Sequence, residues 1–63
     1  MIDPDALHMG AVVVIAAFDD VPAHRFKIHT VEVDCVTGFA LTGPLAGSYG
    51  EPPIDLIIAI AKN

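Results

Sequence analysis

Two of the three histidines and two adjacent aspartates are the residues of this chain that come nearest to a metal-binding set. His24 and His29 are separated by an odd number of positions, so an unbroken strand would place them on opposite faces. Asp19 or Asp20 could supply a further ligand from the preceding turn, but the set matches no recognised ligand spacing. The pattern favours polar surface histidines, and we expect neither a metal ion nor any other cofactor.

The single cysteine, Cys35, does not have the surroundings of a catalytic nucleophile. Asp34 precedes it and no basic residue adjoins it, so we expect the pKa of the thiol to be raised. A single cysteine also excludes an intrachain disulfide and a multi-cysteine zinc site. We therefore expect Cys35 to be a turn or packing residue.

The acidic residues dominate the charge of the chain but form no evident catalytic pair. Eight acidic and three basic residues give a formal net charge of -5. Asp19 and Asp20 should diverge into solvent on a turn, and an acid–base pair would need Glu51 or Asp55 folded against them. We expect these acids to be solvated turn residues.

The few basic residues exclude two large classes of partner. Arg25, Lys27 and Lys62 are too few to neutralise a row of phosphates, so we expect no nucleic acid and no binding to anionic membranes. The longest apolar runs, 11–18 and 56–61, are shorter than the roughly 20 residues that span a bilayer. No basic segment followed by an apolar stretch marks a signal peptide, so we expect a cytoplasmic protein.

One aromatic residue is well placed to contact a ligand or a partner protein. Tyr49 is the only tyrosine and stands in a loop rich in Gly and Pro, which would display its ring. The alternative is a ring folded back over the core. His24 and Arg25 offer a similar mixed surface, and Glu51 lies close to Tyr49 in the loop. We expect ligand or partner contacts at Tyr49, His24, Arg25 and Glu51.

The elements that must position these residues begin with an N-terminal arm, 1–10. Asp3 can cap a short helical turn, Pro4 suits its first position, and Gly10 can end it in the left-handed conformation. The pair His8–Met9 is also typical of a cloning-site remnant. With the arm included, 1–63 is expected to be one small domain.

The second predicted strand, 25–33, contains a change of phase. Its apolar residues occupy even positions before His29 and odd positions after Thr30, so Val31, Val33 and Cys35 should follow Phe26 and Ile28 into the core. A shift of one residue within a strand is what a β-bulge produces. The pattern therefore predicts a bulge at this point.

A hairpin should follow the bulged strand. A tight turn at Asp34–Cys35 leads into a returning strand, 36–42, in which Gly38 indicates a kink or a close backbone approach. The alternative places the turn at Thr37–Gly38. The next stretch, 43–53, contains too many Gly and Pro residues for a long helix or strand, although 44–47 could form a single helical turn.

Two predicted strands, 12–18 and 54–61, are apolar on both faces. The whole chain is 54% apolar but only 6% aromatic, and its mean hydropathy of +0.63 is high for so short a chain. If both strands lie at or near sheet edges, a second copy of the chain would cover their outer faces. We expect a homo-oligomer whose interface includes Val12, Val14, Ile57, Ala59 and Ala61.

The order of these elements resembles that of SH3-like small barrels. Four or five short strands, a long connection after the first, one tight hairpin and a Pro-rich turn before the last strand carry the resemblance, which covers about 10–61. It is architectural, because the aromatic-rich first loop and the Trp of peptide-binding SH3 domains are missing. It implies an all-β fold, a barrel of four to five antiparallel strands with a short N-terminal helical turn.

The expected function is a non-enzymatic, homo-oligomeric interaction or ligand-binding module. One alternative is an enzyme whose active site forms only at an oligomer interface, as in the plasmid-borne dihydrofolate reductases, with Arg25 and Lys27 facing anionic cofactors. Another is an acidic inhibitor that masks a basic partner protein. Its acidic face would be made of Asp19, Asp20, Glu32, Asp34 and Glu51.

Overall fold

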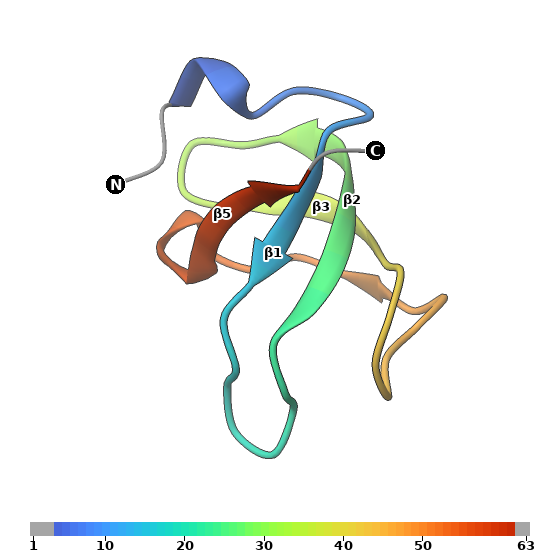
Figure 1. Cartoon of the computed structure of the whole chain (residues 1–63). Coiled ribbons are helices and arrows are strands. Elements are labelled where there is room, and N and C mark those ends of the chain that lie inside the picture. The colour runs from blue at the N-terminus through green and yellow to red at the C-terminus, as the bar shows by residue number, and fades with distance from the viewer. Residues whose placement is uncertain (1–3, 62–63) are drawn as a thin grey trace.

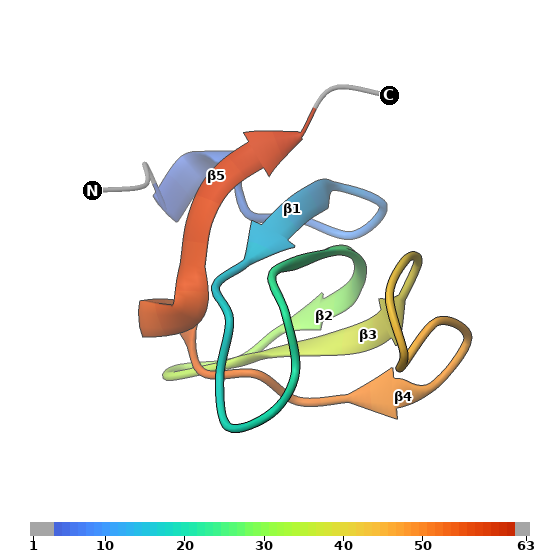
Figure 2. The ribbon, with the colours of Figure 1, turned by 60° about the horizontal axis from the view of Figure 1, so that its bottom comes forward.

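The computed structural model describes residues 4–61, whose strands form one antiparallel sheet (Figure 1). The elements are the 3-10 helix η1 (Pro4–Ala6), the strands β1 (Val12–Ile15), β2 (His24–Val31), β3 (Val36–Ala40) and β4 (Tyr49–Gly50), the 3-10 helix η2 (Ile54–Leu56) and the strand β5 (Ile57–Ala61). The strand order is β4-β3-β2-β1-β5, so β4 and β5 are the edges of an open sheet. The chain between them crosses from one edge to the other (Figure 2). The predicted all-β class is confirmed.

The bulge that the sequence predicts in β2 is present. Ile28 pairs with Gly38 on β3, and the next pair is Thr30 with Thr37, so His29 has no partner in the ladder. An extra residue of this kind lets a strand bend, as a small curved sheet requires.

The predicted inward positions after the bulge are wrong for Val31 and Val33, whereas Cys35 is half-buried. Val31 is 41% exposed and Val33 is 99% exposed. The hydroxyls of Thr30 and Thr37 form a hydrogen bond of 2.6 Å at the end of β2. Val36 of β3 is still in the core, but its partner Val31 ends β2, and residues 32–34 lie in an exposed hairpin turn that leaves the core.

The β2–β3 hairpin turns slightly before its predicted position. The backbone N–H of Glu32 donates to the carbonyl oxygen of Cys35 at 2.8 Å, so the turn is centred on residues 33–34. The alternative turn at 37–38 is wrong, because both residues lie within β3.

Gly38 makes the close backbone approach that its mid-strand position predicts. A Cβ at Gly38 would fall on the carbonyl oxygen of Lys27 and would lie 3.0 Å from Cε1 of Phe26. Only glycine leaves room for β2 and β3 to approach at this place.

The N-terminal arm packs against the sheet. Its helical turn is η1, and the predicted cap Asp3 lies outside the described residues. Gly10 has φ +88° and donates its N–H to the carbonyl oxygen of Ile28 at 2.8 Å, so it shapes the turn before β1 rather than ending η1. Leu7 is 8% exposed and belongs to the core. Within residues 4–61, no helix is long and apolar enough to cross a membrane.

The segment 43–53 contains a strand that the sequence did not predict. Tyr49 and Gly50 form β4 and pair with Phe39 and Gly38 of β3. Residues 44–47 form a turn rather than a helix. A strand of two residues is too short to leave a periodic pattern in the sequence.

Both strands that are apolar on two faces are shorter than predicted. β1 ends at Ile15, and β5 begins only at Ile57 because η2 precedes it. Val14 pairs with Ala59 while Ile15 pairs with Ile57, which leaves Ile58 as a second bulge. In η2 the N–H of Leu56 donates to the carbonyl oxygen of Pro53 at 3.0 Å, and the N–H of Ile54 donates to the carbonyl oxygen of Asp34 at 3.1 Å, so these donors are used outside the β1–β5 ladder.

The core lies on the inner face of the sheet and draws residues from the arm and from four of the strands. Its buried apolar members are Leu7, Ala11, Val13, Ile15, Phe26, Ile28, Val36, Ala40 and Ile57. Phe18, Ile54 and Leu56 are half-buried against it. The side chains of β2 alternate strictly between buried and exposed up to His29, so this strand divides the molecule into an inner and an outer face.

Candidate functional site

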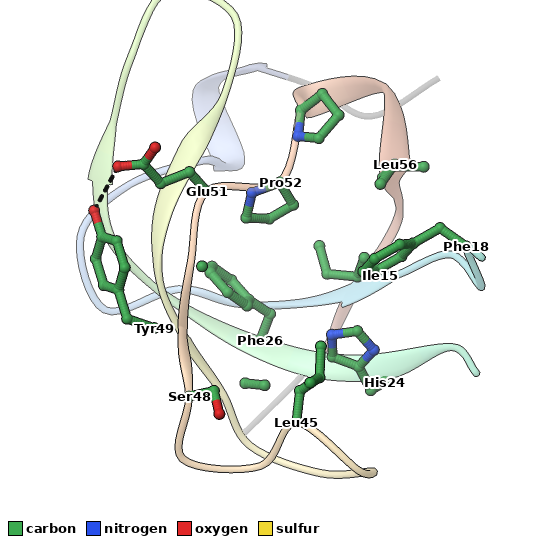
Figure 3. A pocket seen from close by; sticks show the side chains of 13 residues that line it. Ile15, Phe18, His24, Phe26, Leu45, Ser48, Tyr49, Glu51, Pro52 and Leu56 are labelled. Carbon is green, nitrogen blue, oxygen red and sulfur yellow. Dashed lines mark hydrogen bonds between the residues drawn. The ribbon is translucent and has the colours of Figure 1, made fainter. Parts of the chain in front are cut away.

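An apolar pocket opens between the β1–β2 loop, the chain around β4 and η2 (Figure 3). It has a volume of about 340 Å³, a size that accommodates a small ligand. Ile15 and Phe26 line it from the core, where they are 0% and 2% exposed. Leu45, Pro52 and Leu56 supply further apolar walls. The pocket is therefore an opening into the hydrophobic core itself.

His24 is the buried polar residue of this pocket. It is 6% exposed, because it shares the inward alternation of β2 with Phe26, and the prediction of a surface histidine is wrong for it. Its ring nitrogen Nδ1 lies 2.9 Å from the carbonyl oxygen of Pro22, and a carbonyl can only accept. The Nδ1–H group is therefore the donor, and in the neutral ring Nε2 is an acceptor. Among the described residues Nε2 has no hydrogen-bond partner, and it is not sealed from solvent.

Tyr49 and Glu51 form the opposite end of the pocket. The phenol of Tyr49 donates to Oε2 of Glu51 at 2.8 Å (Figure 3). The ring of Tyr49 meets that of Phe39 edge-on, with the centroids 5.7 Å apart. Tyr49 is 56% exposed, so its ring is displayed rather than folded over the core. The hydrogen bond to the Glu51 carboxylate, then partial burial, raises the pKa of Tyr49.

The raised pKa of Tyr49 is directly measurable, because the chain has one tyrosine and no tryptophan. The contribution of this phenol to stability is present below the unfolded-state pKa of about 10 and is lost as the pH rises through the higher folded-state pKa. We expect the ultraviolet titration midpoint of the folded protein to lie above that of the urea-unfolded chain.

Glu51→Gln should lower the folded midpoint towards the unfolded value, because the carboxylate that disfavours phenolate is removed. Glu32→Gln removes an acid that does not hydrogen-bond Tyr49 and should leave the midpoint unchanged. Equal midpoints for the folded and unfolded wild-type chains would contradict the Tyr49–Glu51 hydrogen bond.

Arg25 does not belong to the pocket. It is exposed and alternates with His24 and Phe26 along β2, so it lies on the outer face. Its backbone N–H donates to Oγ1 of Thr42 at 3.0 Å. Of the four residues predicted to make contacts, the structure brings His24, Tyr49 and Glu51 to one pocket and separates Arg25 from them.

Cys35 lies half-buried in a hollow at the base of the β2–β3 hairpin, which we call the acidic hollow because Glu32, Asp34 and Glu51 also line it. Partial burial is the main cause that raises the pKa of the thiol, followed by Asp34, Glu51 and Glu32. The predicted direction is confirmed. A thiol with a raised pKa is mostly protonated at neutral pH, which is unsuited to nucleophilic attack.

Asp19 and Asp20 lie apart from this hollow, at the tip of the β1–β2 loop. Phe18 and Val21 exchange backbone hydrogen bonds of 3.0 and 2.7 Å around them, and Asp19 adopts φ +48°. Both aspartates are exposed. Over residues 4–61, no group of three or more His, Cys, Asp or Glu side chains is placed to hold a metal ion.

A second apolar surface lies on the outer face of β1 and β5. Val12 pairs with Ala61 and Val14 pairs with Ala59, and opposed residues of antiparallel strands point to the same side. We call these four residues the outer patch. Ala59 is exposed, Val14 and Ala61 are half-buried, and Val12 is 8% exposed. Ile57, the fifth residue predicted for an interface, is 5% exposed and lies in the core.

Basic residues border the outer patch. Arg25 pairs with Val14 and Lys27 pairs with Val12 across β1 and β2. Two of the three basic residues of the chain therefore stand beside the patch, whereas neither lines the pocket.

The sequence did not predict several of the residues that line the pocket. Phe18, Leu45, Pro52 and Leu56 come from the β1–β2 loop, the β3–β4 connection and η2, and no spacing in the sequence relates them. The one available signal was Leu45, a large apolar side chain inside a Gly/Pro-rich loop. Such a residue needs either a packing partner or a ligand.

Comparison with known proteins adds no relative: no family model, no curated protein and no solved structure matches the chain.

Proposed function

We propose that this protein is a non-enzymatic interaction module that assembles with further copies of itself through the outer patch. One observation carries the proposal: the register of β1 and β5 gathers Val12, Val14, Ala59 and Ala61 on one side of the sheet edge. Alanines there allow a second sheet to approach closely, because they project little beyond the backbone. The bulge residue Ile58, which is 57% exposed, adds apolar surface at the border.

The small size of the chain supports assembly. A domain of this length buries only about 60% of the surface that its unfolded chain exposes, so its own core stabilises it weakly. β5 is an edge strand, and no Lys or Pro within it protects the edge. Covering this strand and its neighbour β1 with a second copy would remove apolar surface from water.

The charge distribution also favours this face. Two copies with a net charge of -5 repel each other, and the repulsion is smallest where no acid is present. The outer patch carries no acid, and Arg25 and Lys27 border it. Self-association through this face therefore costs less electrostatic free energy than association through the acidic hollow.

The strand arrangement supports an SH3-like small barrel as the scaffold. Four strands follow one another as neighbours from β1 to β4, and β5 returns to pair with β1 after the 3-10 helix η2. The outer patch would then lie on the outside of the barrel wall, where a second barrel can pack against it.

Ala59→Lys tests the proposal. We expect the wild-type protein to be a dimer or larger at micromolar concentration by sedimentation and light scattering. A lysine at the centre of the patch would be desolvated in each copy, so the dissociation constant should rise by about a hundredfold or more. Ala46→Lys is the matched control, since Ala46 is also exposed but lies in the 44–47 turn. It should leave the assembly unchanged.

Circular dichroism of both variants shows whether they remain folded. A wild-type chain that is a folded monomer at this concentration would overturn the proposal. Equal weakening by Ala59→Lys and Ala46→Lys would move the interface away from the outer patch.

A further inference from the structure

The pocket presents hydrogen-bond acceptors at its two ends and apolar walls between them. Glu51 lies beside Tyr49 at one end, His24 lies at the other, and Phe26 occupies the middle (Figure 3). Among the described residues that line the pocket, Glu51 is the one with a formal charge when His24 is neutral, and no Lys or Arg takes part. A ligand that complements this pocket therefore brings donors and positive charge.

His24 supplies the sharper of the two signals. Its side chain is 94% buried, since 6% is exposed, yet Nε2 has no partner among residues 4–61. Nε2 itself is not sealed from solvent, so it is open to a donor that enters the pocket. The Nδ1–H bond to Pro22 holds the ring and its tautomer, so Nε2 is already prepared to accept.

Glu51 supplies the charge. Its Oε2 accepts the phenol of Tyr49, which positions the carboxylate at the mouth of the pocket and leaves its other oxygen free to accept. The ring of Tyr49 also lines the pocket, and aromatic faces attract cations. A carboxylate next to an exposed aromatic ring is a favourable place for an ammonium group.

We propose that this pocket binds an organic ammonium ion with an apolar body and a second N–H donor. The apolar body would fill the space over Phe26, the ammonium would pair with Glu51, and the second donor would bond to Nε2 of His24. This site is separate from the outer patch, so it does not depend on self-assembly.

Tryptamine is a suitable probe, because an indole ring with an N–H group carries an ethylammonium chain. Indole-3-acetate keeps the ring and reverses the charge. Titrations followed by NMR on isotope-labelled protein should shift the amides of Leu45, Ser48 and Gly50, which line the pocket. We expect tryptamine to bind about tenfold more tightly than indole-3-acetate, since the exchange replaces attraction to Glu51 by repulsion.

Changing the ligand tests the role of His24 without changing a buried residue. Tryptamine methylated on its ring nitrogen cannot donate to Nε2, and we expect about threefold to tenfold weaker binding. Glu51→Gln should abolish most of the preference for tryptamine over indole-3-acetate. Glu32→Gln removes an acid that does not line this pocket, and it should leave the preference intact.

A lysine side chain of another protein carries the same ammonium group, so N-acetyl-lysine methylamide is titrated in parallel. Tighter binding of tryptamine supports a free amine as the ligand, and tighter binding of the lysine derivative supports a protein-borne ammonium. Equal affinity for tryptamine and indole-3-acetate, shifts confined to other residues, or no saturable shift up to about 10 mM of either ammonium would overturn the proposal.

Discussion

Gly38→Ala should remove most of the stability of this fold. The new methyl group would fall on the carbonyl oxygen of Lys27 and press on the ring of Phe26, which lies 3.0 Å from the same point. The first of these neighbours is backbone, so no side-chain rotation relieves the overlap, and β2 and β3 must separate. We expect a loss of about 3 kcal/mol or more in the free energy of unfolding, at the upper end of the range for overpacking.

The consequence is severe because a chain of this length has a total stability of roughly 3–9 kcal/mol. Urea unfolding followed by circular dichroism measures the loss of unfolding free energy. A Gly38→Ala variant that is already unfolded without urea would also confirm the prediction. Gly50→Ala is the matched control. A Cβ at Gly50 would meet Phe26 at 3.6 Å and Pro52 at 3.9 Å, which are ordinary contacts. If both variants lose the same stability, close approach at Gly38 is not the cause.

Val13→Ala is expected to cost about 2–3 kcal/mol of unfolding free energy. Val13 is 0% exposed and pairs with Phe26 on one side and Ile60 on the other. The substitution removes apolar groups worth about 0.8 kcal/mol each and leaves a cavity that β1, held between two strands, cannot collapse to fill. The midpoint of urea unfolding should fall, while the slope of the transition stays the same.

Val33→Ala is the same substitution at a residue that is 99% exposed. It should change stability by less than about 0.5 kcal/mol, as surface substitutions usually do. The pair is informative because the alternation of the sequence predicted Val33 to be buried. Similar losses of unfolding free energy in both variants would mean that Val33 packs against other residues, which its 99% exposure contradicts.

The β2 strand shows what the alternation of apolar and polar residues can and cannot predict. The phase change at His29 predicted the bulge, because alternation between the two faces is a property of successive residues. The same pattern failed for Val33, since alternation does not tell where a strand leaves the core. Gly38 was predicted correctly for a related reason: a glycine inside a strand is itself a local sign of a close neighbour.

The candidate site was predicted only in part. Tyr49 and Glu51 were expected to make contacts on account of their Gly/Pro-rich loop, and the structure brings them to one pocket with His24. The burial of His24 was not expected, because a histidine between alanine and arginine resembles a surface residue. Its inward direction follows from its place in the alternation with Phe26, once the start of β2 is known.

The outer patch was also predicted only in part. An interface on the two doubly apolar segments was predicted, but Ile57 belongs to the core and the bulge at Ile58 reverses the alternation expected for β5. Which residues of β5 face outward depends on their partners in β1. That register follows from tertiary contacts, not from the segment itself.

The sequence by itself determined the all-β class, the bulge in β2 and the close approach at Gly38. Each of these depends on the order of neighbouring residues, such as alternation along a strand or a glycine inside one. The raised pKa of Cys35 was predicted from Asp34, but its main cause is burial, which the tertiary structure sets. Only the tertiary structure decided the pocket, the burial of His24 and the outer patch. These depend on which strands lie side by side and in which register, and the burial of residues far apart in the chain sets both.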